Sequence, residues 1–274
     1  MNWGAIFAIV RKDLKVITRS KGVLLPIILV PLIVCVLLPA GFAAAPQLAG
    51  AALAVDAQQD LEQWLRQLPD GLRSQLAQYN ELQTFVVLLA VYFFAPMYLI
   101  LPLMVSSVIA ADSIAGEKER KTLEALLYTP TSDQDLMAAK FLSAWLPAVA
   151  VAWGGFLLYA VVLNVVGWPL FGYIFFPNRM WWLLALWVAP ALAGFGLGVT
   201  ILISARVGTF QEAYQIGGLV VLPVVGLMIS QSTGALYFGP GLVFVLGAGA
   251  WLIDLALIWL GARVLRRSAL LERL

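Results

Sequence analysis

Histidine is absent from the 274-residue chain, and Cys35 is its single cysteine. Without histidine the chain lacks the most common zinc ligand and the usual proton shuttle near neutral pH. This absence counts against a zinc-dependent intramembrane protease and against a histidine-relay pump. One cysteine can form neither an intrachain disulfide nor a cysteine metal cluster. We therefore expect no metal and no cofactor bound by this chain.

Charged residues are also scarce. They make up 12% of the chain, whereas apolar residues make up 62%. A soluble domain carries about 25% charged residues, so water is not the main solvent of this chain. The net charge of +2 is too small to suggest a nucleic-acid partner. The composition indicates an integral membrane protein in contact with a lipid bilayer.

Long uncharged tracts recur along the chain. A spanning helix needs about 20 apolar residues, and the sequence predicts an all-α transmembrane domain over residues 1–274 with six such helices. Residues 230–241 contain turn-forming residues that divide the last uncharged tract into two spans. A re-entrant segment within 230–241 is the alternative for this stretch. The predicted spans are residues 22–42, 85–111, 141–166, 180–204, 213–229 and 242–262.

Basic residues gather on one side of these spans, which predicts the orientation of the chain. Only Arg66, Arg73 and Arg179 fall on the other side. We therefore expect a multi-pass protein of the plasma membrane with both termini in the cytoplasm. The basic residues on the expected cytoplasmic side are Arg11, Lys12, Lys15, Arg19, Lys21, Lys118, Arg120, Lys121, Lys140, Arg206, Arg263, Arg266, Arg267 and Arg273.

Residues 1–20, before the first span, have their own apolar periodicity. Trp3, Phe7, Val10, Leu14 and Ile17 recur at spacings of four and three, with basic residues on other faces. This pattern predicts an amphipathic helix in the cytoplasmic membrane interface. A soluble helix packed on another domain and a cleaved signal peptide are the alternatives. The apolar run that follows is longer than the core of a typical signal peptide.

Residues 46–82 form the predicted extracytoplasmic loop between the first two spans. Two apolar helical stripes, separated by Pro69 to Gly71, indicate a short helical hairpin that rests on the outer leaflet or over the spans. A substrate gate is the alternative interpretation. The stripes consist of Leu61, Trp64, Leu65 and Leu68, and of Leu72, Leu76 and Tyr79.

Asp254 is the one acid that these boundaries place within a span. A carboxylate near the bilayer centre costs about 2.5 to 3.5 kcal/mol on insertion scales, so such a residue is expected to face a partner or water. A structural contact, with water or Arg206, and a direct role in transport are the two interpretations. Gly194 and Gly198 form a small-xxx-small pair suited to close helix packing.

The densest run of charge is the segment GEKERKTLEALLYTP, Gly116 to Pro130. On a helix, Glu117 would lie three and four positions from Arg120 and Lys121, and these would face Glu124 in the same way. Such a self-paired face would contribute only a few tenths of a kcal/mol. A solvated helix that caps the bundle is the structural alternative. A rigid helix with both signs of charge is better suited to receive force from a soluble partner.

This segment resembles the cytoplasmic signature of type-2 ABC transporter permeases, commonly Glu-x-x-Arg-Gly-Thr-x-Glu-x-Leu-Leu-x-x-Pro. Lys121 stands where glycine is usual. The resemblance extends to the Arg-Lys-Asp-Leu stretch at residues 11–14, the six spans and the basic tail at residues 266–274. The matching positions of the signature are Glu117, Arg120, Thr122, Glu124, Leu126, Leu127 and Pro130.

The resemblance implies a permease subunit of an ATP-driven exporter, present as a homodimer or paired with a similar permease and bound to two cytoplasmic ABC ATPase subunits. The chain has no G-x-x-x-x-G-K-[ST] phosphate loop, so we expect ATP and Mg²⁺ to bind those subunits and this chain not to be an enzyme. An ion-coupled secondary transporter and a membrane scaffold without an ATPase are the alternatives. The resemblance implies an ATPase-coupling helix within residues 112–135, with contacts at Gly116, Glu117, Lys118, Glu119, Arg120, Lys121, Thr122, Glu124 and Leu127.

Overall fold

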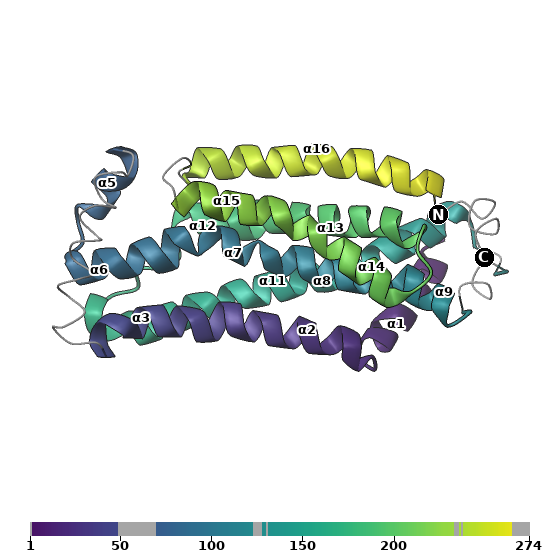
Figure 1. Cartoon of the computed structure of the whole chain (residues 1–274), viewed down its shortest axis with the longest axis horizontal. Helices are drawn as coiled ribbons and strands as arrows, with labels where there is room; N and C mark the ends of the chain where they lie inside the picture. The colour runs from purple at the N-terminus through teal and green to yellow at the C-terminus, as the bar shows by residue number, and fades with distance from the viewer. Residues whose placement is uncertain are drawn as a thin grey trace.

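The computed structural model of the chain describes residues 2–48, 70–122, 128–129, 131–232, 236 and 238–264. Every regular element in these ranges is helical, and six helical runs are long and apolar enough to cross a membrane. They lie lengthwise in one bundle (Figure 1). The predicted class, an all-α integral membrane protein with six spans, is confirmed. The runs are Lys21–Leu48, Glu81–Glu119, Asp133–Phe171, Arg179–Ser204, Phe210–Gln231 and Pro240–Gly261.

Four of the six spans are divided by short π-helical or 3₁₀ segments. The first comprises α2 (Lys21–Leu32), η1 (Ile33–Leu37) and α3 (Leu38–Leu48). The second comprises α6 (Glu81–Val86), η2 (Val87–Phe93), α7 (Ala95–Tyr98), α8 (Ile100–Ala111), η3 (Asp112–Gly116) and α9 (Glu117–Glu119). The third and sixth are the single helices α11 (Asp133–Phe171) and α16 (Pro240–Val264). The fourth comprises α12 (Arg179–Leu183), η4 (Leu184–Val188) and α13 (Ala189–Ser204), and the fifth α14 (Phe210–Gly217), η5 (Gly218–Val221) and α15 (Leu222–Ser232).

The helices run past the predicted spans because polar residues at their ends cap and continue them. Ser132 accepts a hydrogen bond from the Asp135 backbone N–H at the start of α11. Thr209 caps α14 in the same way, and Asn80 forms a capping box with Gln83 at the start of α6. Such caps stabilise a helix end by about 1 kcal/mol. Apolar length therefore determines which residues cross the membrane, and capping side chains determine where the helices begin.

Three prolines within spans coincide with π-helical segments. A proline lacks the N–H that would bond the carbonyl four residues earlier, and for Pro39, Pro96 and Pro190 that carbonyl lies in η1, η2 and η4 respectively. In η2, three successive carbonyls at residues 90–92 accept hydrogen bonds from Tyr159, Trp181 and Gln231, which belong to other spans. In the second span, the irregular segment before Pro96 thus provides hydrogen bonds to three neighbouring spans.

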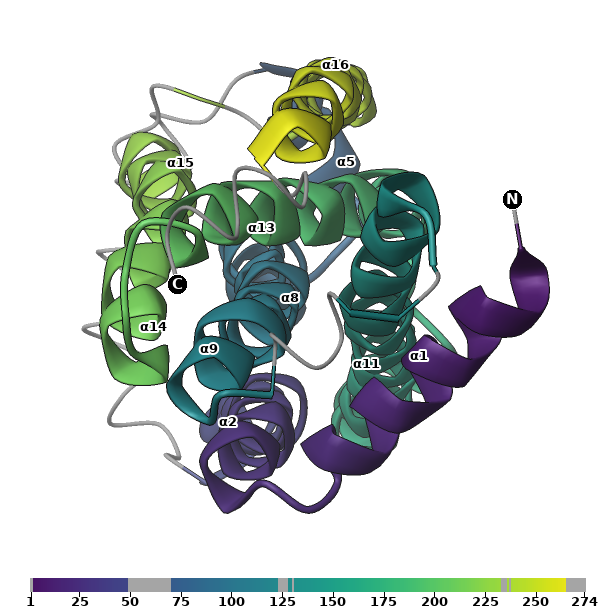
Figure 2. The same ribbon diagram turned by 90° about the vertical axis from the view of Figure 1, so that its right-hand side faces the viewer.

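Helix α1 (Trp3–Ile17) crosses one end of the bundle beside α11, and α9 lies at the same end (Figure 2). We call this the α1 end and the opposite one the α6 end. Most of the predicted outer loop, residues 49–69, lies outside the described residues. Its second apolar stripe forms α5 (Asp70–Leu76), with Leu72 and Leu76 buried. Residues 230–241, predicted to divide the last two spans with a re-entrant segment as the alternative, also lie partly outside the described residues.

At the centre of the bundle α8 packs closely on α13. The hydroxyl of Ser107 donates a hydrogen bond to the Gly196 carbonyl oxygen, 3.3 Å away. A Cβ atom at Gly196 would lie 2.8 Å from the Leu103 carbonyl oxygen and 2.6 Å from the Ser106 hydroxyl. Backbone cannot give way as a flexible side chain can, so this contact requires glycine.

Substituting Gly196→Ala should lower the stability of the chain by about 1 to 3 kcal/mol, because the added methyl group forces α8 and α13 apart. Thermal unfolding followed by tryptophan fluorescence measures the effect. Gly154→Ala in α11 is the matched control, since a Cβ there meets nothing within 4 Å. Equal melting temperatures for the two variants would contradict the close packing of α8 on α13.

Candidate functional site

The charged segment lies at the α1 end, where α9 extends the second span by one short turn. Helix α9 ends at Glu119, and the Thr122 N–H then bonds the Glu117 carbonyl while the Lys121 N–H bonds the Lys118 carbonyl. These two bonds form a Schellman motif, the usual way in which a helix terminates. The sequence predicts one continuous helix from Glu117 to Glu124. This prediction is wrong, because the helix terminates at Lys121. The predicted contacts Glu124 and Leu127 lie outside the described residues.

Lys121 has a backbone φ of 56°, the left-handed conformation that favours glycine. It occupies the C′ position of the Schellman motif, where glycine is the most common residue. The signature of type-2 permeases has glycine at this position. In this chain the position terminates the helix, and Lys121 adopts the left-handed turn at a conformational cost of about 1 to 2 kcal/mol.

Arg120 folds back onto Asp112, which precedes the segment. Its guanidinium donates to Asp112 Oδ1 at 2.9 Å and to Asp112 Oδ2 at 3.4 Å. The hydrogen bond to Asp112 is the main cause that raises the pKa of Arg120 above its usual value. A Cβ at Gly116 would lie 2.7 Å from Asp112 Oδ1 and 3.1 Å from Arg120 Nη1, so Gly116 leaves room for this ion pair.

Glu117 is buried, with only 5% of its surface exposed. Its Oε1 accepts a hydrogen bond from Lys12 Nζ of α1, and its Oε2 lies 2.6 Å from Lys140 Nζ of α11. The expected pairing of Glu117 with Arg120 and Lys121 on one exposed helical face is therefore wrong. Helical spacing singled out Glu117 as a paired charge, but its partners lie on other helices.

Asp13 completes a set of four charges, Lys12, Asp13, Glu117 and Lys140, which we call the four-charge network. The Asp13 carboxylate lies 2.9 Å from Lys12 Nζ and 3.3 Å from Lys140 Nζ, and it accepts a hydrogen bond from Ser143 at 3.1 Å. Two positive and two negative groups leave the network neutral. It joins α1, α9 and α11, three segments that are far apart in sequence.

The network is protected from water on most sides. Asp13 and Lys140 are 5% and 3% exposed, so their charges interact in a medium of lower dielectric constant than water. Burial alone would lower the pKa of Lys12, but its hydrogen bond and charge interactions with Glu117 and Asp13 outweigh this and raise it above 10.5. Lys12 therefore stays charged at neutral pH.

Helix α1 has two apolar faces, and this arrangement places Asp13 inside the protein. The buried face carries Ile6, Ile9, Val10 and Ile17, with Asp13 among them. Trp3 and Phe7 remain 54% and 61% exposed on another face. The predicted amphipathic helix is confirmed, but its predicted apolar stripe is divided between the bundle and the surface. A helix that is apolar on two sides can lie in a membrane interface while it packs on α11.

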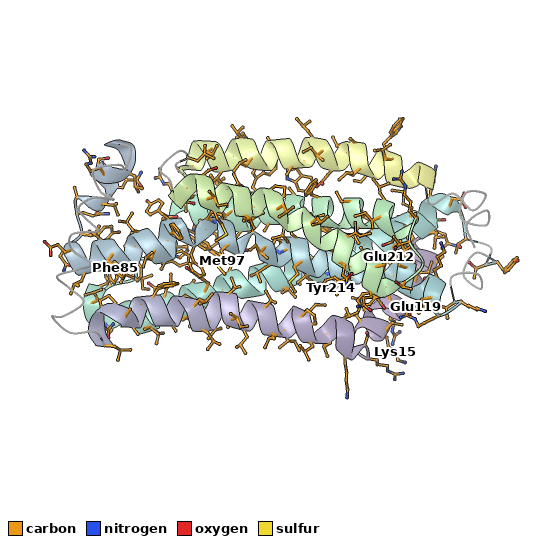
Figure 3. The ribbon with its side chains drawn as sticks, viewed as in Figure 1. Lys15, Phe85, Met97, Glu119, Glu212 and Tyr214 are labelled. Carbon is orange, nitrogen blue, oxygen red and sulfur yellow. The ribbon has the colours of Figure 1, made fainter. Side chains whose placement is uncertain are left out.

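Glu119 links the same segment to the fifth span. Its Oε2 accepts a hydrogen bond from the backbone N–H of Phe210, 2.9 Å away, in the first turn of α14. A carboxylate is favourable there because the first N–H groups of a helix lack partners and carry partial positive charge. Figure 3 shows Glu119 and Glu212 at the α1 end, far from Phe85. Helix α9 thus contacts α1, α11 and α14 directly or through its side chains.

The sequence interpretation missed four residues of this site: Lys12, Asp13, Asp112 and Lys140. Asp13 could have been found, because it stands on the stripe of Ile6, Ile9, Val10 and Ile17 at helical spacing, where an acid requires a partner. Lys140 was counted only as an orientation charge, although Leu136, Ala139 and Ala144 around it are buried. No local signal reveals that these two residues meet Glu117.

Among the described residues of the segment before residue 123, Glu119, Arg120, Lys121 and Thr122 are exposed and Lys118 is half-buried. Tyr128, after the undescribed residues 123–127, is 81% exposed. This surface carries both signs of charge above the buried network. A soluble protein could therefore contact it without disturbing Glu117.

Asp254 lies within α16, away from the α1 end network, and is 2% exposed. Neither of its carboxylate oxygens has a hydrogen-bond partner among the described residues. The suggested contact with Arg206 is not formed, and Arg206 is exposed. Asp254 instead lies against Gly194 of α13.

Six spans, an amphipathic N-terminal helix and a charged segment at one end define a multi-pass membrane protein. A family model described as ABC-2 family transporter protein matches residues 7–241. The chain therefore belongs to the ABC-2 family and is a permease component of an ABC transporter, which works with an ABC ATPase. No curated protein sequence matches the chain.

Substituting Lys140→Met should lower the stability of the chain by about 3 to 5 kcal/mol, because it leaves Asp13 and Glu117 buried with Lys12 as their only cation. Lys140→Arg retains the charge and should cost less. Thermal unfolding of both variants measures the difference. A melting temperature of the Lys140→Met variant equal to that of the wild type would show that the network does not hold α1 and α9 to α11.

Substituting Lys121→Gly should raise the stability by up to about 1 kcal/mol, because glycine adopts a positive φ without steric cost. The greater freedom of glycine in the unfolded chain offsets part of this gain. Lys118→Gly, inside α9, is the control and should destabilise. Destabilisation by both substitutions would argue against the left-handed turn at Lys121.

Proposed function

We propose that the chain is the membrane subunit of an ATP-driven exporter, assembled as a homodimer or with a similar permease. Two ABC ATPase subunits dock on the α1 end, which faces the cytoplasm of a cell whose plasma membrane the chain spans, with both termini on that side. These subunits bind ATP and Mg²⁺, and the present chain transmits their motion. The chain itself is not an enzyme.

The four-charge network is the observation that carries this proposal. It joins the docking segment, through Glu117, to the interfacial helix α1 and to the third span α11. A displacement of α9 is therefore delivered to two other elements at once. Exposed pairs along a single loop helix would move with that loop alone.

The link from Glu119 to α14 extends the same coupling to the fifth span. This bond is exposed and single, so it is weaker than the buried network. We propose that the buried network keeps α1, α9 and α11 together throughout a cycle, while the contact of Glu119 with α14 forms and breaks. The strong and the weak link then divide the bundle into a part that follows the ATPase rigidly and a part that moves relative to it.

The distribution of charge supports the orientation. The described segments of the α1 end carry Arg11, Lys12, Lys15, Lys118 and Lys121, whereas the α6 end carries Arg73 and Arg179. An excess of basic residues is typical of cytoplasmic ends. The apolar membrane region suits lipids, apolar drugs or peptides better than a strongly charged solute.

Charge reversal at Lys121 tests the docking role, because Lys121 is exposed and outside the four-charge network. Lys121→Glu should weaken association with the ATPase by about tenfold, as expected for one interfacial charge, without lowering the melting temperature of the chain. Lys121→Gly keeps the turn and removes the charge, so it should change the choice among related ATPases. Quantitative copurification from the native membrane measures both effects.

Arg179→Glu at the α6 end is the matched control and should leave ATPase association unchanged. Equal ATPase recovery with wild type, Lys121→Glu and Lys121→Gly would refute docking through this segment. A chain that carries no ATPase from its native membrane, and whose transport follows an ion gradient, would instead identify a secondary transporter.

A further inference from the structure

Asp254 has no place in the coupling site, and its surroundings are unusual for an acid. It lies where α16 packs on α13, in a seam lined by Gly194 and Gly198 on one side and by Leu257 on the other. A Cβ at Gly194 would lie 2.4 Å from Asp254 Oδ2 and 2.9 Å from its Cγ. The carboxyl group therefore fills a notch that only glycine leaves open.

Among the described residues, the seam holds no counter-charge for this carboxyl group. Elements α13 and η4 carry no charged residue, and Arg179 of α12 is exposed at the α6 end. Arg263 lies nine positions further along α16, about 13 Å away along the helix axis. On α11, Asp133 and Asp135 lie in the first turn, and Lys140 contacts Asp13 and Glu117. Asp254 forms a hydrogen bond with none of the described residues.

An ionised carboxylate in such a place would lose its hydration without any compensating bond. The cost is several kcal/mol even after local relaxation. Lipid outside the bundle does not solvate the charge. A proton on either oxygen removes the charge and leaves a small, neutral group that fits beside Gly194. We propose that Asp254 is an intramembrane proton-binding site, and that its bound proton holds α16 against α13.

Release of the proton to water at the α1 end would create a carboxylate that only water or a cation can stabilise. The seam would then open, because neither can enter while the carboxyl group is buried against Gly194. The large apolar side chains of the opposite face of α16, such as Leu252 and Leu255, are exposed and do not oppose this movement. The proposal does not depend on the ATPase and holds for the chain by itself.

Hydrogen–deuterium exchange of the α16 backbone amides tests this site in the full-length chain, reconstituted in lipid nanodiscs. After correction for the intrinsic pH dependence of exchange, opening of α16 in the wild type should increase from mildly acidic to mildly alkaline pH. The increase is limited to about tenfold per pH unit for the release of one proton. Asp254→Asn keeps the size of the group and cannot ionise, so its α16 should stay protected throughout. Amides of α11 around Gly154 serve as the internal control.

Two results would overturn the proposal. One is exchange of wild-type α16 that does not change with pH. The other is fast exchange in Asp254→Asn at acidic pH, which would show that the carboxylate, and not its protonated form, holds the helix.

A second measurement needs no variant. In protein labelled with ¹³C-aspartate, infrared spectroscopy at neutral pH should show the isotope-shifted carbonyl band of a protonated carboxylic acid. The absence of that band would also overturn the proposal.

Gly194→Ala should displace the carboxyl group and increase the exchange of the α16 amides at every pH, and adding Asp254→Ala should restore their protection. Failure of the second substitution to restore it would show that the two residues do not share the seam.

Discussion

The requirement that every backbone polar group find a partner inside the membrane governs this bundle. Prolines in three spans remove backbone N–H donors. The turns before these prolines are π-helical segments, whose wider turns direct carbonyl groups outwards. In η2 those carbonyls accept bonds from Tyr159, Trp181 and Gln231. A local defect in one helix thereby becomes a set of directional contacts with three other elements, which apolar side chains alone cannot provide.

The same requirement, applied to charge, shapes the α1 end. Each acid of the four-charge network is shared between two lysines, and serine hydroxyls occupy remaining lone pairs of Asp13. Such a network tolerates no partial loss, because each remaining charge would be buried without compensation. Its members come from the N-terminal helix α1, the end of the second span and the third span, so the relative positions of these three elements are defined by electrostatics as well as by packing.

Apolar length and residue spacing were sufficient to predict the six spans, the N-terminal helix and the location of the charged segment. They were insufficient for its partners, because Glu117 pairs with Lys12, 105 positions away, and not with its helical neighbours. Rules for i to i+4 pairs assume a continuing helix, whereas the turn at Lys121 ends it. The position of Asp13 among apolar residues was a usable signal. The lack of a hydrogen-bond partner for Asp254 was not predictable, because the sequence places Arg206 and Asp254 in the same half of the membrane.

The second and third spans are each 39 residues long. A helix of that length measures about 58 Å, whereas the hydrocarbon core of a bilayer is about 30 Å thick. Tilt accounts for only part of this excess, so both helices extend beyond the hydrocarbon core. The second and third spans thus carry the charged segment beyond the hydrocarbon core. A soluble protein can contact that segment from the α1 end of the bundle.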